Sequence, residues 1–290
     1  MMDRIQEKAY AKLNLSLDVA ERRADGFHDM CMVMQTVSVC DELELQLNDS
    51  GRVQVKSNFS FIPGDERNLA AKAALRFLEA TGHGGQGLLI TLTKSIPVGA
   101  GMAGGSADAA AVLRALNRLY GAPLDPEALE TLAASVGSDV PFCVRGGTVL
   151  ATGRGEKLES LPALPPCKFV ICKPDFSIST PELFRKLDQT GLRCHPDTAG
   201  IVAALREGAL EPLARRMYNV FEEVDDRRLR AVREIKGTLL DSGALGAIMT
   251  GTGSAVFGIF RPDADCAKAV AALRREHSFC CEARAVERLL

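Results

Sequence analysis

The sequence has little net charge and lacks any long apolar run, and these absences exclude several classes of protein. Lys and Arg number 35 against 37 Asp and Glu, and no run of basic residues occurs, so the charge pattern of a nucleic-acid-binding protein is missing. No apolar stretch approaches the roughly 18 residues that a membrane-spanning helix needs. A signal-peptide core is excluded because charges fall near the start, at Asp3, Arg4, Glu7 and Lys8. We expect a cytoplasmic protein with no nucleic-acid and no membrane partner.

The cysteines form neither a disulfide framework nor a metal-binding motif. There are nine of them, an odd number, without the spacing of a small disulfide-rich domain and without any C-x-x-C. Cys194 beside His195, and the pair Cys280-Cys281, are the arrangements most like a metal site, but they lack such a motif. We expect reduced, buried thiols and no metal ligands.

Length and composition are those of a globular protein with a large core. The 290 residues are 47% apolar and 25% charged, which suits one large or two small domains. A proline-rich stretch at 161–166 has the composition of a linker. We predict a domain change near residue 155, with one domain at 1–155 and the other at 156–290.

A cluster of glycines at 99–105 is the strongest local signal in the sequence. Four glycines fall within seven residues, after a strand-like run at 88–93 and before apolar residues that recur at helical spacing from Ser106 to Tyr120. Such a turn leaves backbone amides uncovered, and amides at the start of a helix favour an anion, most often a phosphate. We predict that Ser106 caps this helix and that the loop cradles a phosphate.

Three interpretations of this loop compete. An ordinary strand-to-helix turn would not need so many glycines, which are entropically costly. Gly99-x-Gly101-x-x-Gly104 fits the dinucleotide-binding pattern, but a helical pattern at 126–135 follows where that fold needs a strand. A Walker loop ends in Gly-Lys-Ser/Thr, where this chain has Gly-Ser-Ala. The favoured interpretation is a non-Walker phosphate loop whose cation comes from elsewhere in the chain.

Residues 11–19 alternate between apolar and polar side chains, which predicts a strand with one buried face. Lys12 and Asn14 lie on the other face, and from the alternation alone we expect that face to be solvated. A second apolar run at 30–39 is expected to pair with this strand. The N-terminal half of the chain is therefore predicted to be rich in β-structure.

Two short motifs allow both a structural and a functional interpretation. Phe27 and His28 follow the turn signal Asp25-Gly26 and suit either a packed hairpin end or contact with a flat ligand ring. Asp139 stands between a glycine and an apolar run, where an exposed helix-capping aspartate is the common case. Its carboxylate could instead face the predicted phosphate cradle. The residues alone leave both alternatives open.

The remaining patterns predict alternating helices and strands. Asn68 is expected to cap a helix that stops at Gly82. The second half is expected to contain a strand at 168–173, helices at 182–187, 198–206, 209–217 and 226–241, short strands at 247–249 and 255–260, a helix at 264–274 and a strand at 279–286. Its glycine-rich turn at 250–254 is either a plain hairpin turn or a second loop that lines the same phosphate.

Three segments together resemble the GHMP small-molecule kinase superfamily: Pro97-x-Gly-Ala-Gly-x-x-Gly-Gly-Ser, the strand with Lys12, and Met249-Thr-Gly-Thr-Gly-Ser. Within it, motifs along nearly the whole chain resemble the kinases that act on 4-diphosphocytidyl-2-C-methyl-D-erythritol. These motifs are Ala11-Lys12-Leu13-Asn14-Leu15, Arg23-x-Asp25-Gly26-Phe27-His28, Gly137-Ser138-Asp139-Val140-Pro141-Phe142, Ser179-Thr180-Pro181 with Phe184, and Tyr218-Asn219-Val220-Phe221-Glu222. Galactokinases, homoserine kinases and mevalonate kinases share the glycine loop but not the N-terminal set.

The resemblance implies an α+β, two-domain GHMP kinase fold. Its N-terminal ATP-binding domain would be of the ribosomal protein S5 domain 2-like type, and its C-terminal α/β domain would be ferredoxin-like. It also implies an enzyme that uses ATP and Mg²⁺ to phosphorylate the 2-hydroxyl of that cytidine-diphosphate-linked polyol, in non-mevalonate isoprenoid precursor synthesis. A GHMP kinase for another small alcohol, and a nucleotide-binding sensor or pseudokinase, stay as alternatives.

By the same resemblance, Asp139 is expected to be the catalytic base and Lys12 its partner. The triphosphate is expected to lie on the loop residues Pro97, Gly99, Ala100, Gly101, Met102, Ala103, Gly104, Gly105 and Ser106. The substrate is expected to contact Asn14, Phe27, His28, Lys94, Asp139, Thr180 and Phe184. The chemistry is consistent, because a carboxylate can accept the hydroxyl proton while a cation keeps it ionised and stabilises the transferring oxygens.

The glycine loop departs from the superfamily's usual Gly-Leu-Gly-Gly-Gly-Ser-Ser. Met102, Ala103 and Ala107 stand where Leu, Gly and the second Ser are usual. Alanine has fewer backbone angles available than glycine, and Ala107 lacks a hydroxyl that could contact a phosphate or Mg²⁺. Since Lys12 and Asp139 are both present, the sequence still predicts an active enzyme.

Overall fold

The computed structural model describes residues 3–23, 26 and 28–290. The first part of the chain forms β1 (Arg4–Arg22), β2 (His28–Asn48), β3 (Val53–Ser57), α1 (Leu69–Ala80), β4 (Gly87–Thr93), α2 (Gly104–Leu119), α3 (Pro126–Ala134), α4 (Val140–Arg145), β5 (Thr148–Gly153) and β6 (Lys157–Ser160). The second part forms β7 (Lys168–Lys173), α5 (Thr180–Thr190), α6 (Thr198–Glu207), α7 (Leu210–Arg216), β8 (Tyr218–Asn219), the 3₁₀ helix η1 (Val220–Glu223), α8 (Leu229–Asp241), β9 (Gly246–Met249), β10 (Val256–Phe260), α9 (Ala267–Leu273) and β11 (Phe279–Arg284). The predicted α+β class is confirmed.

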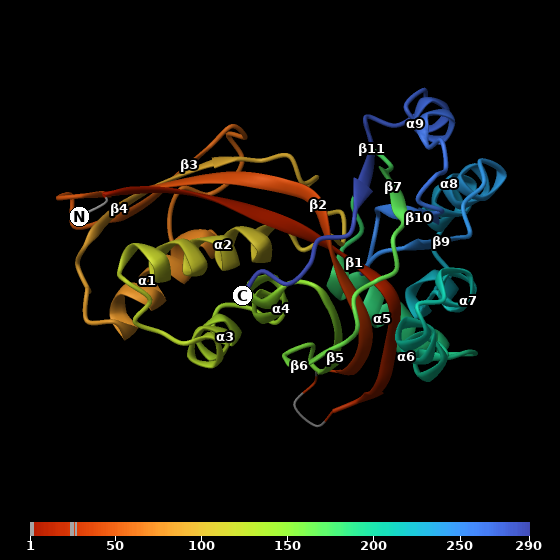
Figure 1. The fold of residues 1–290 in the computed structure, drawn as a ribbon, viewed down its shortest axis with the longest axis horizontal. Helices are drawn as coiled ribbons and strands as arrows, with labels where there is room; N and C mark the ends of the chain where they lie inside the picture. The colour runs from red at the N-terminus through yellow and green to blue at the C-terminus, as the bar shows by residue number, and fades with distance from the viewer. Residues whose placement is uncertain (1–2, 24–25, 27) are drawn as a thin grey trace.

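The larger sheet is built on the long antiparallel pair β1 and β2 (Figure 1). Its strand order is β3-β4-β2-β1-β8. Strand β5 pairs with the first part of β2, at residues 30–35, and β6 pairs with β5. Helices α1 to α4 gather on one side of this sheet, where Figure 1 shows them below the strands. Alternate β1 side chains such as Leu13 and Leu15 are fully buried and begin the core between the layers.

The smaller sheet has the order β11-β7-β10-β9 and is antiparallel throughout the described residues. Strands β9 and β10 form the hairpin predicted around the turn at 250–254. Two links tie this second part to the larger sheet: β8 pairs in parallel with β1, and Ala285 bridges to Val37 of β2. The end of the chain therefore returns to the first part, as Figure 1 shows.

Most of the predicted helices and strands are confirmed, including the helix that Asn68 caps through a hydrogen bond from the Ala70 amide to its side chain. The predicted cap of α2 is wrong. The helix begins at Gly104, so Ser106 lies inside its first turn. The capping position belongs to Ala103, which adopts the left-handed conformation (φ 57°, ψ 31°) and makes no side-chain cap bond. An L-residue with a Cβ pays about 1–2 kcal/mol for that conformation.

The prediction of a solvated face on β1 is also wrong. Lys12 is 4% exposed and Asn14 is fully buried, although both lie on the polar side of the alternation. The reason is a segment far along the chain, since the turn after β9 covers this face and its Gly251 amide donates to the Asn14 side chain. At Lys12 and Asn14, β1 is therefore buried on both faces although its sequence alternates.

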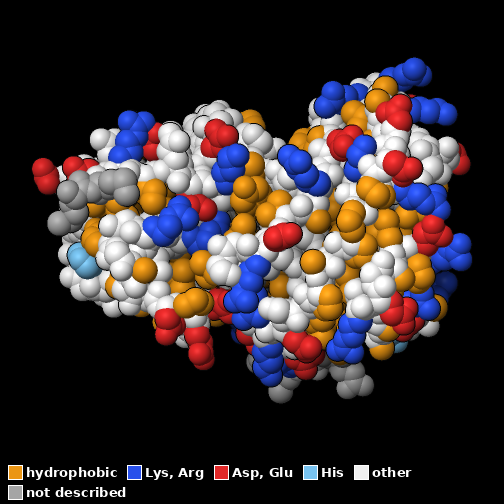
Figure 2. Space-filling model, in the orientation of Figure 1, with side chains coloured by type: hydrophobic (Ala, Val, Ile, Leu, Met, Phe, Trp, Pro, Cys, Tyr) orange, Lys and Arg blue, Asp and Glu red, His pale blue; other side chains and the backbone are white. Residues whose placement is uncertain are grey.

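The surface agrees with the balanced composition. Figure 2 shows Lys and Arg side chains interspersed with Asp and Glu over one face of the molecule. Within the described residues, no helix is both long and apolar enough to cross a membrane. All nine cysteines are free thiols, as predicted, but the expectation that they are buried is wrong for Cys194, which is exposed.

Candidate functional site

The two glycine-rich turns contact each other through their backbones. Gly101 has φ +74°, and a Cβ there would lie 2.2 Å from the Thr250 carbonyl oxygen. A Cβ on Gly251, also at positive φ, would lie 2.8 Å from the Gly101 oxygen. The Ala255 amide donates to the Ala100 carbonyl at 3.1 Å, which holds the two turns together. Both turns therefore need glycine because no side chain fits between them.

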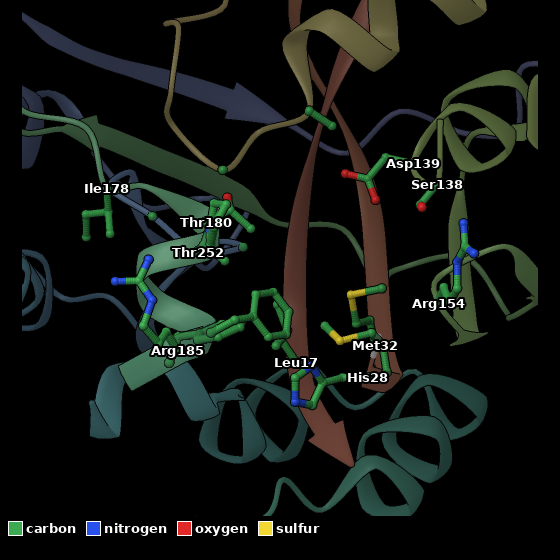
Figure 3. Close-up of a pocket in the computed structure, with 18 of the residues that line it drawn as sticks. Leu17, His28, Met32, Ser138, Asp139, Arg154, Ile178, Thr180, Arg185 and Thr252 are labelled. Carbon is green, nitrogen blue, oxygen red and sulfur yellow. The ribbon is translucent and has the colours of Figure 1, made fainter. Parts of the chain in front are cut away.

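A pocket of about 850 Å³ lies where these turns meet the strands β1 and β2. Its residues come from both parts of the chain. Figure 3 shows Ser138 and Asp139 on one side, Thr180 and Thr252 on the opposite side, and Leu17 and His28 further along. The pocket thus has a reacting end, where the glycine turns and Asp139 lie, and an outer end near His28.

Lys12 reaches the reacting end from β1. Its Nζ donates to Asn14 Oδ1 at 2.5 Å, and its backbone amide donates to the Met102 carbonyl of the first glycine loop at 3.2 Å. Burial lowers the pKa of the Lys12 ammonium, and the negative charge of Asp139 opposes that shift. Lys12 and Asp139 both line the pocket, so the structure brings the two predicted catalytic residues to the same end.

Asn14 holds the cation and the second turn rather than facing the pocket. Its Oδ1 accepts from Lys12, from the Thr250 hydroxyl at 3.2 Å and from the Gly251 amide at 2.9 Å. Its Nδ2 points to the Met32 sulfur at 3.4 Å. The predicted substrate contact of Asn14 remains a prediction, because its side chain is absent from the described lining of the pocket.

Asp139 occupies the position before α4 but does not cap it with its side chain. The carboxylate therefore stays directed to the pocket, which favours the second of its two interpretations. Buried Arg114 of α2 fixes α4 in place, since its Nη1 donates to the Cys143 carbonyl at 2.6 Å and its Nη2 to the Lys8 carbonyl of β1 at 2.9 Å. One guanidinium thus joins the elements that carry Lys12, the glycine loop and Asp139.

The outer end of the pocket is aromatic. The His28 and Phe184 rings stack with centroids 5.1 Å apart, and Phe184 meets Phe221 edge-on at 4.9 Å. His28 Nε2 lies 2.7 Å from Asp188 Oδ1, so its ring N–H can donate a hydrogen bond to that carboxylate. His28, Phe184 and Thr180 all line the pocket as expected, whereas Phe27 lies outside the described residues.

Lys94 is not among the described residues that line the pocket, so its predicted substrate contact remains a prediction. Its Nζ is buried between the Asp41 and Asp108 carboxylates, at 2.5 Å from Asp108 Oδ2, beneath the start of α2. Asp41 also accepts the Ser95 and Ile96 amides, which anchors the segment that enters the glycine loop. No local sequence pattern indicates this triad, because its acids stand 53 and 14 residues from the lysine.

The buried triad holds two acids against one base. Asp108 Oδ1 has no hydrogen-bond partner within the part of the chain that the structure describes. Burial raises the pKa of the Asp108 carboxyl to about 8, and Lys94 opposes that shift. Asp108 is therefore expected to hold its proton at neutral pH.

Three predicted loop residues line the pocket: Gly99, Gly101 and Ala103. The Ala100 and Met102 side chains are buried in the core, and their carbonyls hold the second turn and Lys12. Contacts of the triphosphate with the rest of the loop remain predictions: Pro97, Gly104, Gly105 and Ser106.

Several lining residues were missed from sequence, including Ser138, Arg154, Arg185, Asp188 and Thr252. For Arg185 and Asp188, helical spacing in the sequence could have predicted a place in the pocket. Once Thr180 and Phe184 are placed on one helix face, Asp188 follows at the next turn and Arg185 beside it.

Comparison with known proteins agrees with this geometry. Residues 68–147 match the GHMP kinases N terminal domain family, and residues 201–278 match the GHMP kinases C terminal family. Over 262 residues the chain is 44% identical to the 4-diphosphocytidyl-2-C-methyl-D-erythritol kinase of Geobacillus sp. (strain WCH70), with 90% of this chain and 89% of that relative covered. The chain belongs to the GHMP kinase family.

This GHMP kinase is also 44% identical over 256 residues to the protein of the same name from Bacillus subtilis, with 88% of each chain covered. It is similar to a crystal structure of 4-(cytidine 5'-diphospho)-2C-methyl-D-erythritol kinase, with a TM-score of 0.80, 34% identity and coverage of 97% of this chain and 99% of that one. A homoserine kinase from Cytophaga hutchinsonii shares the fold, with a TM-score of 0.77 at 24% identity and coverage of 99% and 96%.

Two substitutions in the loop of this GHMP kinase test the contact between the turns. Gly101→Ala is expected to destabilise the protein by about 1–3 kcal/mol, because its Cβ overlaps the Thr250 oxygen. Ala103→Gly is expected to stabilise it by about 0.5–1 kcal/mol, because glycine relieves the left-handed strain at a smaller entropic cost. Urea unfolding measures the free energy of unfolding of both variants. A change of the same sign in the two variants would contradict the prediction.

A second prediction concerns the proton on Asp108. The unfolded carboxyl ionises near its ordinary pKa of 3.8, whereas the folded one holds its proton to about pH 8. Between these values the folded state binds the extra proton, so the free energy of unfolding falls as pH rises. Asp108→Asn cannot titrate, and wild type is expected to lose stability relative to it between pH 5 and pH 8.

Thermal and urea unfolding of wild type and Asp108→Asn across that pH range make the comparison. Asp41→Asn is the contrasting variant, since it removes a buried charge that Lys94 needs, and we expect it to cost about 3 kcal/mol. Parallel pH profiles for wild type and Asp108→Asn would show that Asp108 is ionised in the folded protein.

Proposed function

We infer that this GHMP kinase transfers the γ-phosphoryl group of ATP to the 2-hydroxyl of 4-diphosphocytidyl-2-C-methyl-D-erythritol, in non-mevalonate isoprenoid precursor synthesis. The observation that carries the inference is the pocket itself. It places a Lys12–Asp139 pair beside two glycine turns at one end and an aromatic surface of His28 and Phe184 at the other. Relatives of that name at 44% identity over most of the chain support the choice of substrate.

The reacting end provides what phosphoryl transfer requires, which is mainly positioning and neutralised charge. In this proposal the backbone amides of the glycine loop, together with the positive end of α2, bind the triphosphate. Asp139 accepts the proton of the substrate hydroxyl. Lys12 keeps Asp139 ionised and stabilises the transferring oxygens, and Asn14 holds the Lys12 ammonium in place.

Mg²⁺ is part of the proposal as the ion that neutralises and orients the phosphates. Among the described residues no group of three or more His, Cys, Asp or Glu side chains is arranged to hold a metal. Mg²⁺ usually keeps several waters and binds substrate phosphates with few protein ligands, so the reacting end does not need a cluster of carboxylates. The donor set at the reacting end therefore fits this mode of binding.

The outer end would hold the cytidine. A base stacks on an aromatic ring, and its polar edge needs hydrogen-bonding groups, which Phe184 and His28 supply. Domains at 1–155 and 156–290 are proposed to contribute the ATP-binding side and the opposite wall of the pocket, respectively.

The direct test measures ATP consumption with Mg²⁺, with and without 4-diphosphocytidyl-2-C-methyl-D-erythritol, and the mass of the product. We expect turnover only with the substrate present and a product heavier by one phosphate. Turnover with a different alcohol alone would assign another acceptor. Binding of ATP without any product from a panel of alcohols would overturn the enzyme assignment and favour a sensor.

The role of Asp139 is tested by Asp139→Asn, which keeps the shape of the side chain and removes the base. We expect kcat to fall about 100- to 10,000-fold, because that is the usual contribution of a positioned general base. Binding of ATP, measured by calorimetry, should change little. Wild-type turnover in a folded Asp139→Asn protein would show that another group accepts the proton.

A further inference from the structure

Helix α5 runs along the pocket from the reacting end to the outer end. Thr180, at its first turn, lies 2.8 Å from Thr252 of the second glycine turn, oxygen to oxygen. Asp188, two turns later, contacts His28 at the outer end. Eight residues of helix span about 12 Å, so α5 extends between the two ends of the pocket.

Arg185 is the cation on this wall. It lines the pocket from α5 and is exposed. Figure 3 shows its guanidinium on the same side of the pocket as Thr180 and Thr252, and apart from His28. Over the described residues, Arg185 makes no hydrogen bond and no ion pair. The acid one turn away does not neutralise it, since Asp188 is engaged with His28.

The other cations near α5 are neutralised by acids. Lys186 pairs with Asp226 at 2.8 Å and with Glu182 at 3.6 Å. Arg228 pairs with the same two carboxylates, at 2.5 Å and 2.7 Å. The helix therefore separates its positive charges, with Lys186 inside an ion cluster and Arg185 presented to the pocket with its charge uncompensated.

The proposed substrate has its own order of parts: a base, a ribose, a diphosphate and the alcohol that is phosphorylated. With the base at Phe184 and the reacting hydroxyl at Asp139, the diphosphate must lie in the stretch of pocket between them. Arg185 follows Phe184 on α5, and Figure 3 shows its side chain extending back toward Thr180, so its guanidinium can reach that stretch from the α5 wall. Its planar guanidinium can bind two phosphate oxygens at once, which a hydroxyl or an aromatic ring cannot do.

We propose that Arg185 binds the diphosphate of the substrate and thereby selects a nucleotide-linked alcohol over a free polyol. This inference rests on the proposed function, because the diphosphate is a feature of that substrate. It assigns Arg185 a role in specificity and none in proton transfer. Its removal is expected to raise KM for the substrate about 10- to 100-fold and to leave kcat within a few-fold, since a hydrogen-bonded charge contact is lost at a distance from the reacting atoms.

The experiment measures the affinity of CDP and of cytidine for the full-length protein by calorimetry, in wild type, Arg185→Ala and Lys186→Ala. The two variants remove one positive charge from neighbouring positions of the same helix, but Lys186 faces the ion cluster. We expect Arg185→Ala to lower the affinity for CDP at least tenfold and to leave the affinity for cytidine unchanged. Lys186→Ala should leave both affinities unchanged, and Arg185→Lys should restore part of the CDP affinity.

Three results would overturn the assignment: unchanged CDP affinity in Arg185→Ala, an equal loss for CDP and cytidine, or wild type that binds CDP no more tightly than cytidine. Failure of the proposed function is recognised separately. Wild type that binds CDP through Arg185 but phosphorylates no alcohol would overturn the kinase assignment and leave the role of Arg185 standing.

Discussion

The two parts of the chain meet through backbone atoms, at the contact between Gly101 and the turn that contains Thr250 and Gly251. A Cβ on either glycine would overlap the opposite turn. This close approach closes the reacting end of the pocket and covers the polar face of β1. It is also what buries Asn14, whose amide oxygen then holds both the Gly251 amide and the Lys12 ammonium. The position of the Lys12 ammonium is therefore a consequence of the contact between two turns that lie 150 residues apart.

Buried charges keep the surrounding elements in place. Arg114 joins α2 to the carbonyls of β1 and α4, and the Lys94 triad anchors the segment that leads into the glycine loop. Each of these groups is hydrogen-bonded to backbone, so each fixes a main-chain position rather than only a side chain. Protonation of Asp108 reduces the electrostatic cost of the triad, because two ionised carboxylates facing one ammonium would leave an uncompensated buried charge.

Sequence patterns predicted most of the fold and part of the site. Periodicity located the helices and the long strands, because it reports which face each element buries. The glycine cluster and the likeness to GHMP kinases pointed to Lys12, Asp139, His28, Thr180 and Phe184, which the structure gathers around one pocket.

Contact between distant segments explains why the face of β1 was wrongly predicted to be solvated, since the turn that covers it lies far away in sequence. The Lys94 triad was missed for the same reason, because Asp41 is 53 residues from Lys94. The cap at Ser106 failed for a different reason, since Ala103 tolerates a left-handed conformation that its residue type disfavours. Arg185 and Asp188 became visible only after α5 was placed along the pocket.

In the proposed function, one pocket orients the substrate, with the cytosine at α5 and the reacting hydroxyl at Asp139. A crystal structure with 4-diphosphocytidyl-2-C-methyl-D-erythritol and a non-hydrolysable ATP analogue tests it most directly. We expect the 2-hydroxyl of the bound substrate to lie within hydrogen-bond distance of Asp139, roughly 2.6–3.2 Å, and the cytosine ring to lie against Phe184. A substrate bound in the reverse direction, or outside this pocket, would contradict it.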